Sequence, residues 1–238
     1  SRTRKQGRFS SAATGTGEFQ CPVYATGTAA TGCGNCSGYC SLDQSVSTQH
    51  KTVAVLGAGS WGTALAIHLA RAGLNVRLWG NHPEHVQVLQ KERCNQKYLP
   101  DVGFPDNLAL YSNLEDALSG GNLLVLIVIP SHAYRSFLKS SSSLFNEGMS
   151  IAWASKGLEE GTGKLLHQVF NEEIPQCKRL AVISGPTFAK EVARDLPTAI
   201  TVASDMEEVA NEWRDCLHNG YFRAYTSNDV TGVELGGA

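Results

Sequence analysis

From Lys51 onward, short apolar runs alternate with longer stretches in which apolar residues recur at helical spacing. Short runs of β-prone residues are typical of buried strands, and the stretches between most of them fit helices. This alternation predicts the α/β class, with a doubly wound, mostly parallel Rossmann-type sheet covered by helices on both faces. The expected strands are 53–56, 76–79, 108–111, 123–129, 151–154, 180–183, 199–203 and 222–225.

The longest apolar run is LLVLIVIP at positions 123–130. It is far shorter than the roughly 20 residues that a helix needs to cross a bilayer. Parallel sheets are covered on both faces, so a continuously apolar run of this length indicates a central strand. We therefore expect no membrane span.

Three helices carry signals for where they begin or end. Pro83 suits the first turn of one helix, because the N–H that proline lacks would have no partner there. Two patterns with Ser or Asp followed by Glu three residues later predict capping boxes, and a glycine after an amphipathic stripe predicts a helix end. These residues are Ser112 with Glu115, Asp205 with Glu208, and Gly220.

A glycine-rich turn follows the first expected strand, with the sequence VAVLGAGSWG at 53–62. In a dinucleotide-binding turn, Gly57 would allow the tight bend, Gly59 would let phosphates approach, and Gly62 would let the helix pack closely. The helix that follows would offer free N–H groups to an anion. Ser60 and Trp61 stand at the tip, where they could contact phosphate and ribose, and Ser60 could also cap the helix.

The segment after the second strand bears on which dinucleotide would bind. An NAD-specific turn usually places an Asp or Glu there to hold the ribose 2′-hydroxyl. This chain has neither, and the nearest polar residues are Arg77, Asn81 and His82. The sequence therefore leaves NAD and NADP both open.

Polar residues also follow the later strands, where the ligands of open α/β sheets bind. His132 could act in acid–base chemistry or could simply begin a helix. Lys156 would place a positive charge where an anionic substrate or cofactor phosphate binds. Gly185 and Thr187 would allow close backbone approach and supply a hydroxyl, although a plain strand-to-helix turn uses the same residue types.

Composition narrows the class of protein. The chain has 238 residues, 42% of them hydrophobic, with 20 basic and 22 acidic side chains. This balance does not favour a nucleic-acid binder, which usually carries a strongly basic face. Three cysteines are scattered singly in 51–238, as in a reduced cytoplasmic protein, and no motif suggests catalysis by them. They are Cys94, Cys177 and Cys216.

Residues 1–50 differ from the rest, because they are rich in Gly, Ser, Thr and Ala and poor in branched aliphatic residues. Such a segment buries too little apolar surface to offset the entropy of ordering it, so we expect a disordered, low-complexity leader before a dinucleotide-binding domain at 51–238. Its cysteines lack the second pair or histidines of a usual zinc site. These cysteines are Cys21, Cys33, Cys36 and Cys40.

Several blocks, in this order, resemble the bacterial NAD(P)-dependent glycerol-3-phosphate dehydrogenases: GAGSWGTALA, LPDVGFPDNL, VIPSH, WASKGLE, AVISGPTFAKEVARDLPTAI and GVELGGA. The resemblance covers 51–238. It implies reversible hydride transfer between sn-glycerol 3-phosphate and NAD or NADP, giving dihydroxyacetone phosphate, in glycerophospholipid biosynthesis. It also implies a cytoplasmic enzyme, with a homodimer as one arrangement of the full-length protein.

The resemblance assigns roles to particular residues. It implies a catalytic part for Lys156 and a substrate site at Lys156, Gly185 and Thr187. The implied cofactor contacts are Gly57, Gly59, Ser60, Trp61, Gly62, Asn81, Lys156 and Ala189. No metal site is implied.

The chain departs from the family after the GGA block. There the family has a lysine that acts as general acid–base, followed by a helical substrate domain, whereas this sequence stops at Ala238. We expect a fragment that binds nucleotide weakly at best and shows no measurable turnover. Two other hypotheses are a complete, non-catalytic dinucleotide-binding or redox-sensing module, and a metal-binding adaptor that uses the cysteine-rich leader.

Overall fold

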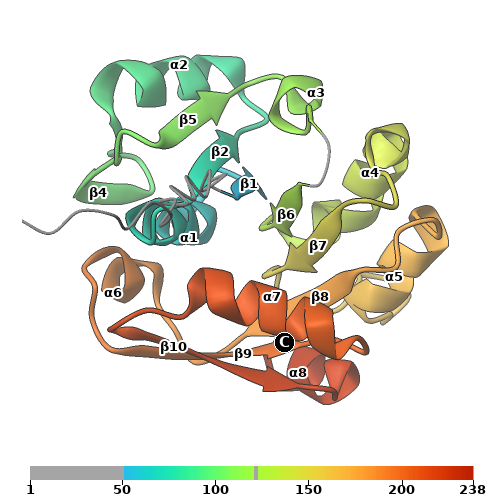
Figure 1. Cartoon of the computed structure of the whole chain (residues 1–238). Helices are drawn as coiled ribbons and strands as arrows, with labels where there is room; N and C mark the ends of the chain where they lie inside the picture. Colours follow the sequence, from blue (N-terminus) through green and yellow to red (C-terminus); the bar gives the residue numbers. More distant parts are fainter. Residues whose placement is uncertain (1–50, 121–122, 238) are drawn as a thin grey trace, which may run out of the picture. The chain divides into compact units, whose positions relative to one another are not determined.

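The computed structural model describes residues 51–120 and 123–237, and within them an eight-stranded sheet lies between helices (Figure 1). The strands are β1 (Thr52–Leu56), β2 (Asn75–Trp79), β5 (Leu108–Tyr111), β6 (Leu124–Ile127), β7 (Ser150–Trp153), β8 (Leu180–Ser184), β9 (Thr198–Ala203) and β10 (Phe222–Ser227). All eight strands predicted from the sequence are confirmed, with ends that differ by at most two residues.

The order of strands in the sheet is β10-β9-β8-β7-β6-β1-β2-β5. Six neighbouring strands run parallel, as in a Rossmann sheet: β8, β7, β6, β1, β2 and β5. The register pairs Val53 of β1 with Val76 of β2 and with Leu124 of β6. β9 is antiparallel to β8, and β10 is parallel to β9. The strand order reverses between β1 and β6, so ligands are expected beyond the carboxyl ends of these two strands.

The helices follow the predicted alternation. They are α1 (Ser60–Arg71), α2 (Pro83–Glu92), α3 (Leu114–Ala117), α4 (Ser131–Ser141) with the 3₁₀ turn η1 (Ser142–Leu144), α5 (Leu166–Glu173), α6 (Ala189–Ala193), α7 (Glu207–Leu217) and α8 (Val230–Gly237). Alternate side chains of β1 enter two separate apolar cores, with Val53 and Val55 on one face and Ala54 and Leu56 on the other. One core holds side chains of α1, α2, α6 and α7, and the other holds those of α4 and α5.

A short antiparallel hairpin lies outside the main sheet and was not predicted. It joins β3 (Cys94–Asn95) to β4 (Leu99–Gly103) with an irregular register. The sequence here contains Pro100 and Asp101, which are poor strand formers, and Asp101 has a positive φ of 68°. Local propensity therefore gave no strand signal.

The helix-start predictions are partly wrong. Pro83 is the first residue of α2, as expected. Ser112 does not cap α3, because the side chain of Asn113 accepts the hydrogen bond from the N–H of Glu115 at 2.8 Å. Asn and Ser are equally good caps, so the sequence alone could not choose between neighbours.

The predictions for the two ends of α7 are also wrong. Its N-cap residue is Met206, not Asp205, and no side chain caps it. The N–H of Met206 instead donates to the Oγ of Ser204 at 3.1 Å. The helix ends at Leu217, ahead of Gly220, because the chain must turn there to enter β10.

The leader lies outside the described residues, and so do the predictions for Cys21, Cys33, Cys36 and Cys40. In the part that the structure describes, Cys94, Cys177 and Cys216 are free thiols, and burial raises the pKa of Cys177 and of Cys216 to about 11. None of the helices within 51–120 and 123–237 has the length and apolar character to cross a membrane.

Candidate functional site

The glycine turn after β1 is held tightly against the end of β6. Gly57 has a φ of 128°, and its N–H donates to the carbonyl oxygen of Trp79 at 2.9 Å. A Cβ at Gly57 would lie 2.2 Å from the carbonyl oxygen of Val128, and a Cβ at Gly62 would lie 1.9 Å from the carbonyl oxygen of Gly57. Both positions therefore exclude any side chain, as predicted for the tight bend and the close helix packing.

Gly59 is in a different environment. It is the N-cap residue of α1, it is exposed, and a Cβ built there would meet no heavy atom of the described chain within 4 Å. Ser60 is the first helical residue, so the alternative that Ser60 caps α1 is wrong. Because glycine offers no side chain as a cap, the first N–H groups of α1 face the space in front of Gly59.

Asn95 supports the turn from the hairpin, and sequence reasoning missed it. Its buried side-chain amide donates to the carbonyl oxygen of Ala58 at 3.1 Å and to the Oγ1 of Thr63 at 2.8 Å. Its Oδ1 accepts from the N–H of Tyr98 at 3.3 Å. Asn95 thus joins the turn, the start of α1 and the hairpin. A lone Asn in a polar stretch carries no local sign of such long-range contacts.

Two hollows open on either side of the glycine turn. The first hollow has a volume of about 620 Å³ and is bounded by the turn, the segments after β2 and β6, and α4. Of the residues considered from the sequence, its lining includes Gly57, Gly59, Asn81, His82 and His132. It therefore brings the glycine turn together with Asn81 and His82, the residues considered for the ribose 2′-position, and with His132.

The second hollow has a volume of about 430 Å³ and lies across the ends of β6, β7 and β8. It shares Gly59 and the 128–130 segment with the first hollow. Its lining includes these predicted site residues: Gly59, Ser60, Trp61, Gly62, Lys156, Thr187 and Ala189. The two hollows meet at the topological switch point, where an open α/β sheet binds its ligand.

Lys156 is the cationic residue of the second hollow. It follows β7 and is exposed, and no partner for its amine was found among the residues that the structure describes. The neighbouring Ser155 accepts a hydrogen bond from the N–H of Ile129 at 3.2 Å, which fixes the start of the lysine segment against the end of β6. A solvent-facing ammonium at this position can meet an anion in the hollow.

Thr187 brings a hydroxyl to the same hollow. Its Oγ1 is buried, yet it has no hydrogen-bond partner within the described residues. An unpaired buried hydroxyl costs free energy unless a ligand or water satisfies it, which is consistent with a binding role. Thr187 lies two residues before α6.

Gly185 lines neither hollow in the structure. A Cβ there would lie 2.8 Å from the carbonyl oxygen of Ala199 and 3.0 Å from the Cα of Ile200. The close approach that this glycine allows is therefore to β9, and its predicted substrate contact has no geometric support. Arg77 is also outside both hollows, because its guanidinium donates to the carbonyl oxygens of Ala117 and Ser119.

His85 and Tyr98 complete the first hollow, and sequence reasoning did not single them out. Their rings meet edge to face with centroids 5.4 Å apart. The Nε2 of His85 is buried and has no partner in the described structure. Burial, assisted by the charge of Lys97, lowers the pKa of His85 below its ordinary value, so this ring is neutral at pH 7.

Comparison with known families gives a match over residues 52–210, to the family described as the NAD-dependent glycerol-3-phosphate dehydrogenase N-terminus. A curated relative from Pseudoalteromonas translucida, a glycerol-3-phosphate dehydrogenase [NAD(P)+], is 50% identical over 194 residues. That alignment covers 81% of this chain and 58% of the relative. The chain thus spans little more than half the length of the curated relatives it matches.

Solved structures agree with this match. The glycerol-3-phosphate dehydrogenase of Coxiella burnetii superposes with a TM-score of 0.75 at 44% identity, covering 79% of this chain and 57% of that one. The glycerol-3-phosphate dehydrogenase of Saccharomyces cerevisiae gives a TM-score of 0.71 at 24% identity, covering 79% of this chain and 59% of that one. The yeast likeness shows the shared fold.

Proposed function

This chain belongs to the family of NAD-dependent glycerol-3-phosphate dehydrogenases, and on that premise we propose that it binds NAD or NADP at the glycine turn. We further propose that the whole protein transfers a hydride reversibly between C2 of sn-glycerol 3-phosphate and the nicotinamide. The product in the oxidative direction is dihydroxyacetone phosphate, and the reductive direction supplies glycerophospholipid synthesis.

The environment of Gly59 carries the proposal. This glycine lies at the switch point, its missing Cβ opens onto free space, and both hollows meet there. Gly57 and Gly62 are explained by packing within the protein, whereas nothing within the described chain requires a glycine at position 59. A phosphate approaching the N–H groups of α1 does require one.

The residues around the turn fit a dinucleotide. The start of α1 would hold the diphosphate, with Ser60 and Trp61 beside it, and the first hollow would hold the adenosine end near Asn81. The nicotinamide, when bound, supplies the hydride acceptor or donor. Among the residues that the structure describes, neither Asp nor Glu lines the first hollow, so a ribose 2′-position placed there would meet no carboxylate that repels a 2′-phosphate.

The second hollow fits the phosphorylated substrate. Lys156 would place its ammonium beside the substrate phosphate or a developing alkoxide, and the attraction would strengthen where bound ligand excludes water. Thr187 would donate its unpaired hydroxyl to a substrate oxygen, and Ala189 at the start of α6 would border the cofactor. For Gly185 we propose only an indirect role in substrate binding: its close approach to β9 sets the position of the segment that carries Thr187.

We also propose a cytoplasmic location. It is supported by the free thiols of the described region, two of which are buried. A homodimer of the full-length protein is a further proposal from the sequence.

Calorimetric titration of NADPH into the chain tests the cofactor site on which the proposed function rests. We expect saturable binding that Lys156→Met weakens at least about tenfold, because a charge-assisted contact to phosphate is lost. Lys190→Met is the matched control, since Lys190 is exposed on α6 and lines neither hollow. Absence of binding, or equal losses in both variants, would refute the assignment.

A further inference from the structure

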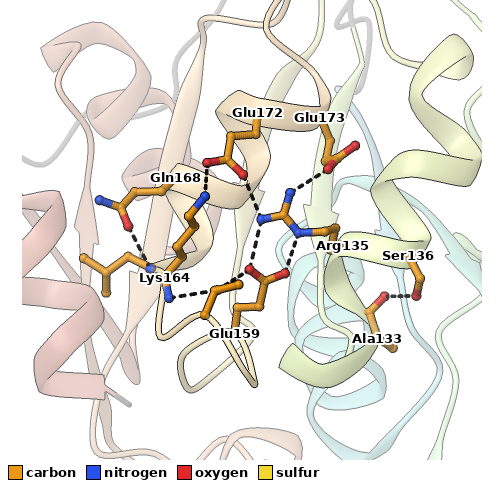
Figure 2. Close-up of polar contacts among 10 residues, drawn as sticks. Ala133, Arg135, Ser136, Glu159, Lys164, Gln168, Glu172 and Glu173 are labelled. Carbon is orange, nitrogen blue, oxygen red and sulfur yellow. Dashed lines mark hydrogen bonds and ion pairs between the residues drawn. The ribbon is translucent and has the colours of Figure 1, made fainter.

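Three carboxylates surround the guanidinium of Arg135 on α4 (Figure 2). Its Nε and Nη2 bind the two carboxylate oxygens of Glu159 at 2.5 and 2.9 Å, in a bidentate pair. Its Nη1 donates to Glu173 at 2.6 Å, and Nη2 also donates to Glu172 at 2.8 Å. Arg135 therefore joins α4 to α5 and to the segment between β7 and α5.

Glu159 belongs to the same segment as Lys156, three residues further along the chain. Its carboxylate also accepts from the hydroxyl of Thr162. Its backbone N–H donates to the carbonyl oxygen of Lys164 at 2.9 Å, and its own carbonyl oxygen accepts from the N–H of Gly163 at 3.0 Å. Glu159 thus organises a compact turn over 159–164, and Arg135 fixes that turn to α4.

Successive contacts attach the lysine segment to the end of β6 and to α4. Ser155 accepts from the N–H of Ile129. Gly157 has a φ of 94° and packs on Ser131, whose Oγ would lie 3.2 Å from a Cβ at that position. The third contact along the segment is the ion pair between Glu159 and Arg135. Lys156 lies between the first two contacts and faces the second hollow, so its position depends on how firmly the segment is held on both sides.

The Arg135 cluster is not itself an anion site. It contains Arg135 and Lys164 as cations, against Glu159, Glu172 and Glu173. The carboxylates outnumber the cations, so a phosphate would be repelled. The arrangement instead suits a structural tie, because bidentate Arg–carboxylate pairs define orientation better than single contacts.

We propose that Arg135, acting through Glu159, is a positioning residue that holds the Lys156 segment at the second hollow. This inference rests on the proposed function, in which Lys156 contacts the dinucleotide and the substrate. The side chain of Glu159 is 11% exposed and that of Arg135 is 31% exposed, so the pair is partly shielded from solvent. Hydrogen bonds from Arg135 lower the pKa of Glu159 to about 2, which keeps the pair ionised throughout the neutral range.

A double-mutant cycle on the full chain tests the inference through the Kd for NADPH. We expect Arg135→Met to weaken binding by roughly three- to tenfold when Lys156 is present, a range typical of coupled residues. In the Lys156→Met background, Arg135→Met should change the Kd less than about twofold. An equal loss in both backgrounds would show that Arg135 does not act through Lys156.

The cluster offers its own matched variants. Glu159→Gln removes the partner on the lysine segment and should behave like Arg135→Met, whereas Glu173→Gln removes a partner of the same guanidinium on α5 and should leave the Kd within about twofold. Arg135→Lys keeps the charge without the bidentate geometry, and it replaces Arg135→Met in the experiment if that variant fails to fold. Similar losses for Glu159→Gln and Glu173→Gln would overturn the inference.

Amide hydrogen exchange gives a readout that needs no ligand. Exchange at the N–H groups of Glu159 and Gly163 should rise in Arg135→Met and Glu159→Gln and stay unchanged in Glu173→Gln. Unchanged exchange in the first two variants would refute the positioning role even if the wild-type chain binds nucleotide. If the wild-type chain binds no nucleotide, the proposed function fails, and the exchange pattern still decides whether Arg135 orders the segment.

Discussion

At the residue scale, the glycines of the turn meet different surroundings although the sequence presents them as one motif. Gly57 and Gly62 pack closely against backbone carbonyl oxygens, and Gly59 faces open space. The tight bend predicted at Gly57 and the close packing predicted at Gly62 are confirmed, and the approach of phosphates at Gly59 stays a prediction. Its spacing could not show which atoms each glycine meets, because the contact of Gly57 with the carbonyl oxygen of Val128 depends on where β6 lies beside the turn.

Gly62→Ala should destabilise the protein strongly. The added methyl group would lie 1.9 Å from the carbonyl oxygen of Gly57, so the turn or α1 must move. Overpacking of this kind costs about 1–3 kcal/mol or more. Urea unfolding of the variant would measure the loss of stability. Gly73→Ala is not a suitable comparison, because Gly73 has a φ of 90°. A change below about 0.5 kcal/mol would contradict the packing described here.

Asn95→Ala should cost about 1–3 kcal/mol, because it leaves the buried carbonyl oxygen of Ala58 and the hydroxyl of Thr63 without their donor. Asn113→Ala is the matched control, since Asn113 is exposed and only caps α3. Chemical denaturation compares the two variants. A loss for Asn95→Ala no larger than for the control would show that the hairpin does not support the turn.

At the element scale, the sequence predicted the sheet well and its connections less well. β6 is apolar throughout and β1 is apolar after Thr52, because both faces of a central parallel strand are buried, and this signal is local. The β3–β4 hairpin and the cap at Asn113 depend on contacts with neighbouring elements. The antiparallel placement of β9 likewise follows from pairing with β8 and not from any pattern within β9.

α8 is fixed to the sheet by one buried carboxylate. Glu234 accepts from the indole N–H of Trp153 at 2.7 Å and from the backbone N–H of His167 at 3.1 Å, and its other oxygen contacts the ring Nδ1 of His167 at 2.5 Å. Its side chain is 5% exposed. At the other end of α8, Gly237 packs on Ser184 at the end of β8.

Glu234→Ala should therefore loosen α8 and cost about 2–4 kcal/mol, since it leaves a buried indole N–H and a backbone N–H unpaired. Exchange of the α8 amides and urea unfolding would report the effect. Glu92→Ala, at an exposed position at the end of α2, should stay within about 0.5 kcal/mol of wild type. Equal stability of both variants would contradict the role of Glu234.

At the scale of the whole domain, His68 joins the parallel part of the sheet to its antiparallel extension. From α1, its Nε2 lies 2.7 Å from the carbonyl oxygen of Leu217 at the end of α7, and its ring stacks on Phe222 of β10 at 4.1 Å between centroids. Burial lowers the pKa of His68 below its ordinary value of 6.5. The folded protein therefore holds this ring neutral.

The direction of the pH dependence follows from that shift. Because the pKa of His68 is lower in the folded chain, the unfolded chain binds more protons at this ring as the pH falls toward and below about 6.5, so stability falls as the pH is lowered. The melting temperature should drop between pH 7.5 and 5.5, and the drop should be smaller in His68→Gln. The low pKa of Glu159 acts below about pH 4.5, outside this window. An identical drop in the variant would contradict the assignment to His68.

The central claim is that a dinucleotide diphosphate binds where Gly59 opens onto both hollows. Calorimetric titration of NADH and NADPH into the wild-type chain and into Gly59→Leu tests it most directly. The open space at Gly59 predicts that the variant keeps the wild-type melting temperature and loses the binding heat, because the added side chain occupies the diphosphate position. Equal binding heats in the two proteins, or none in the wild-type chain, would contradict the account.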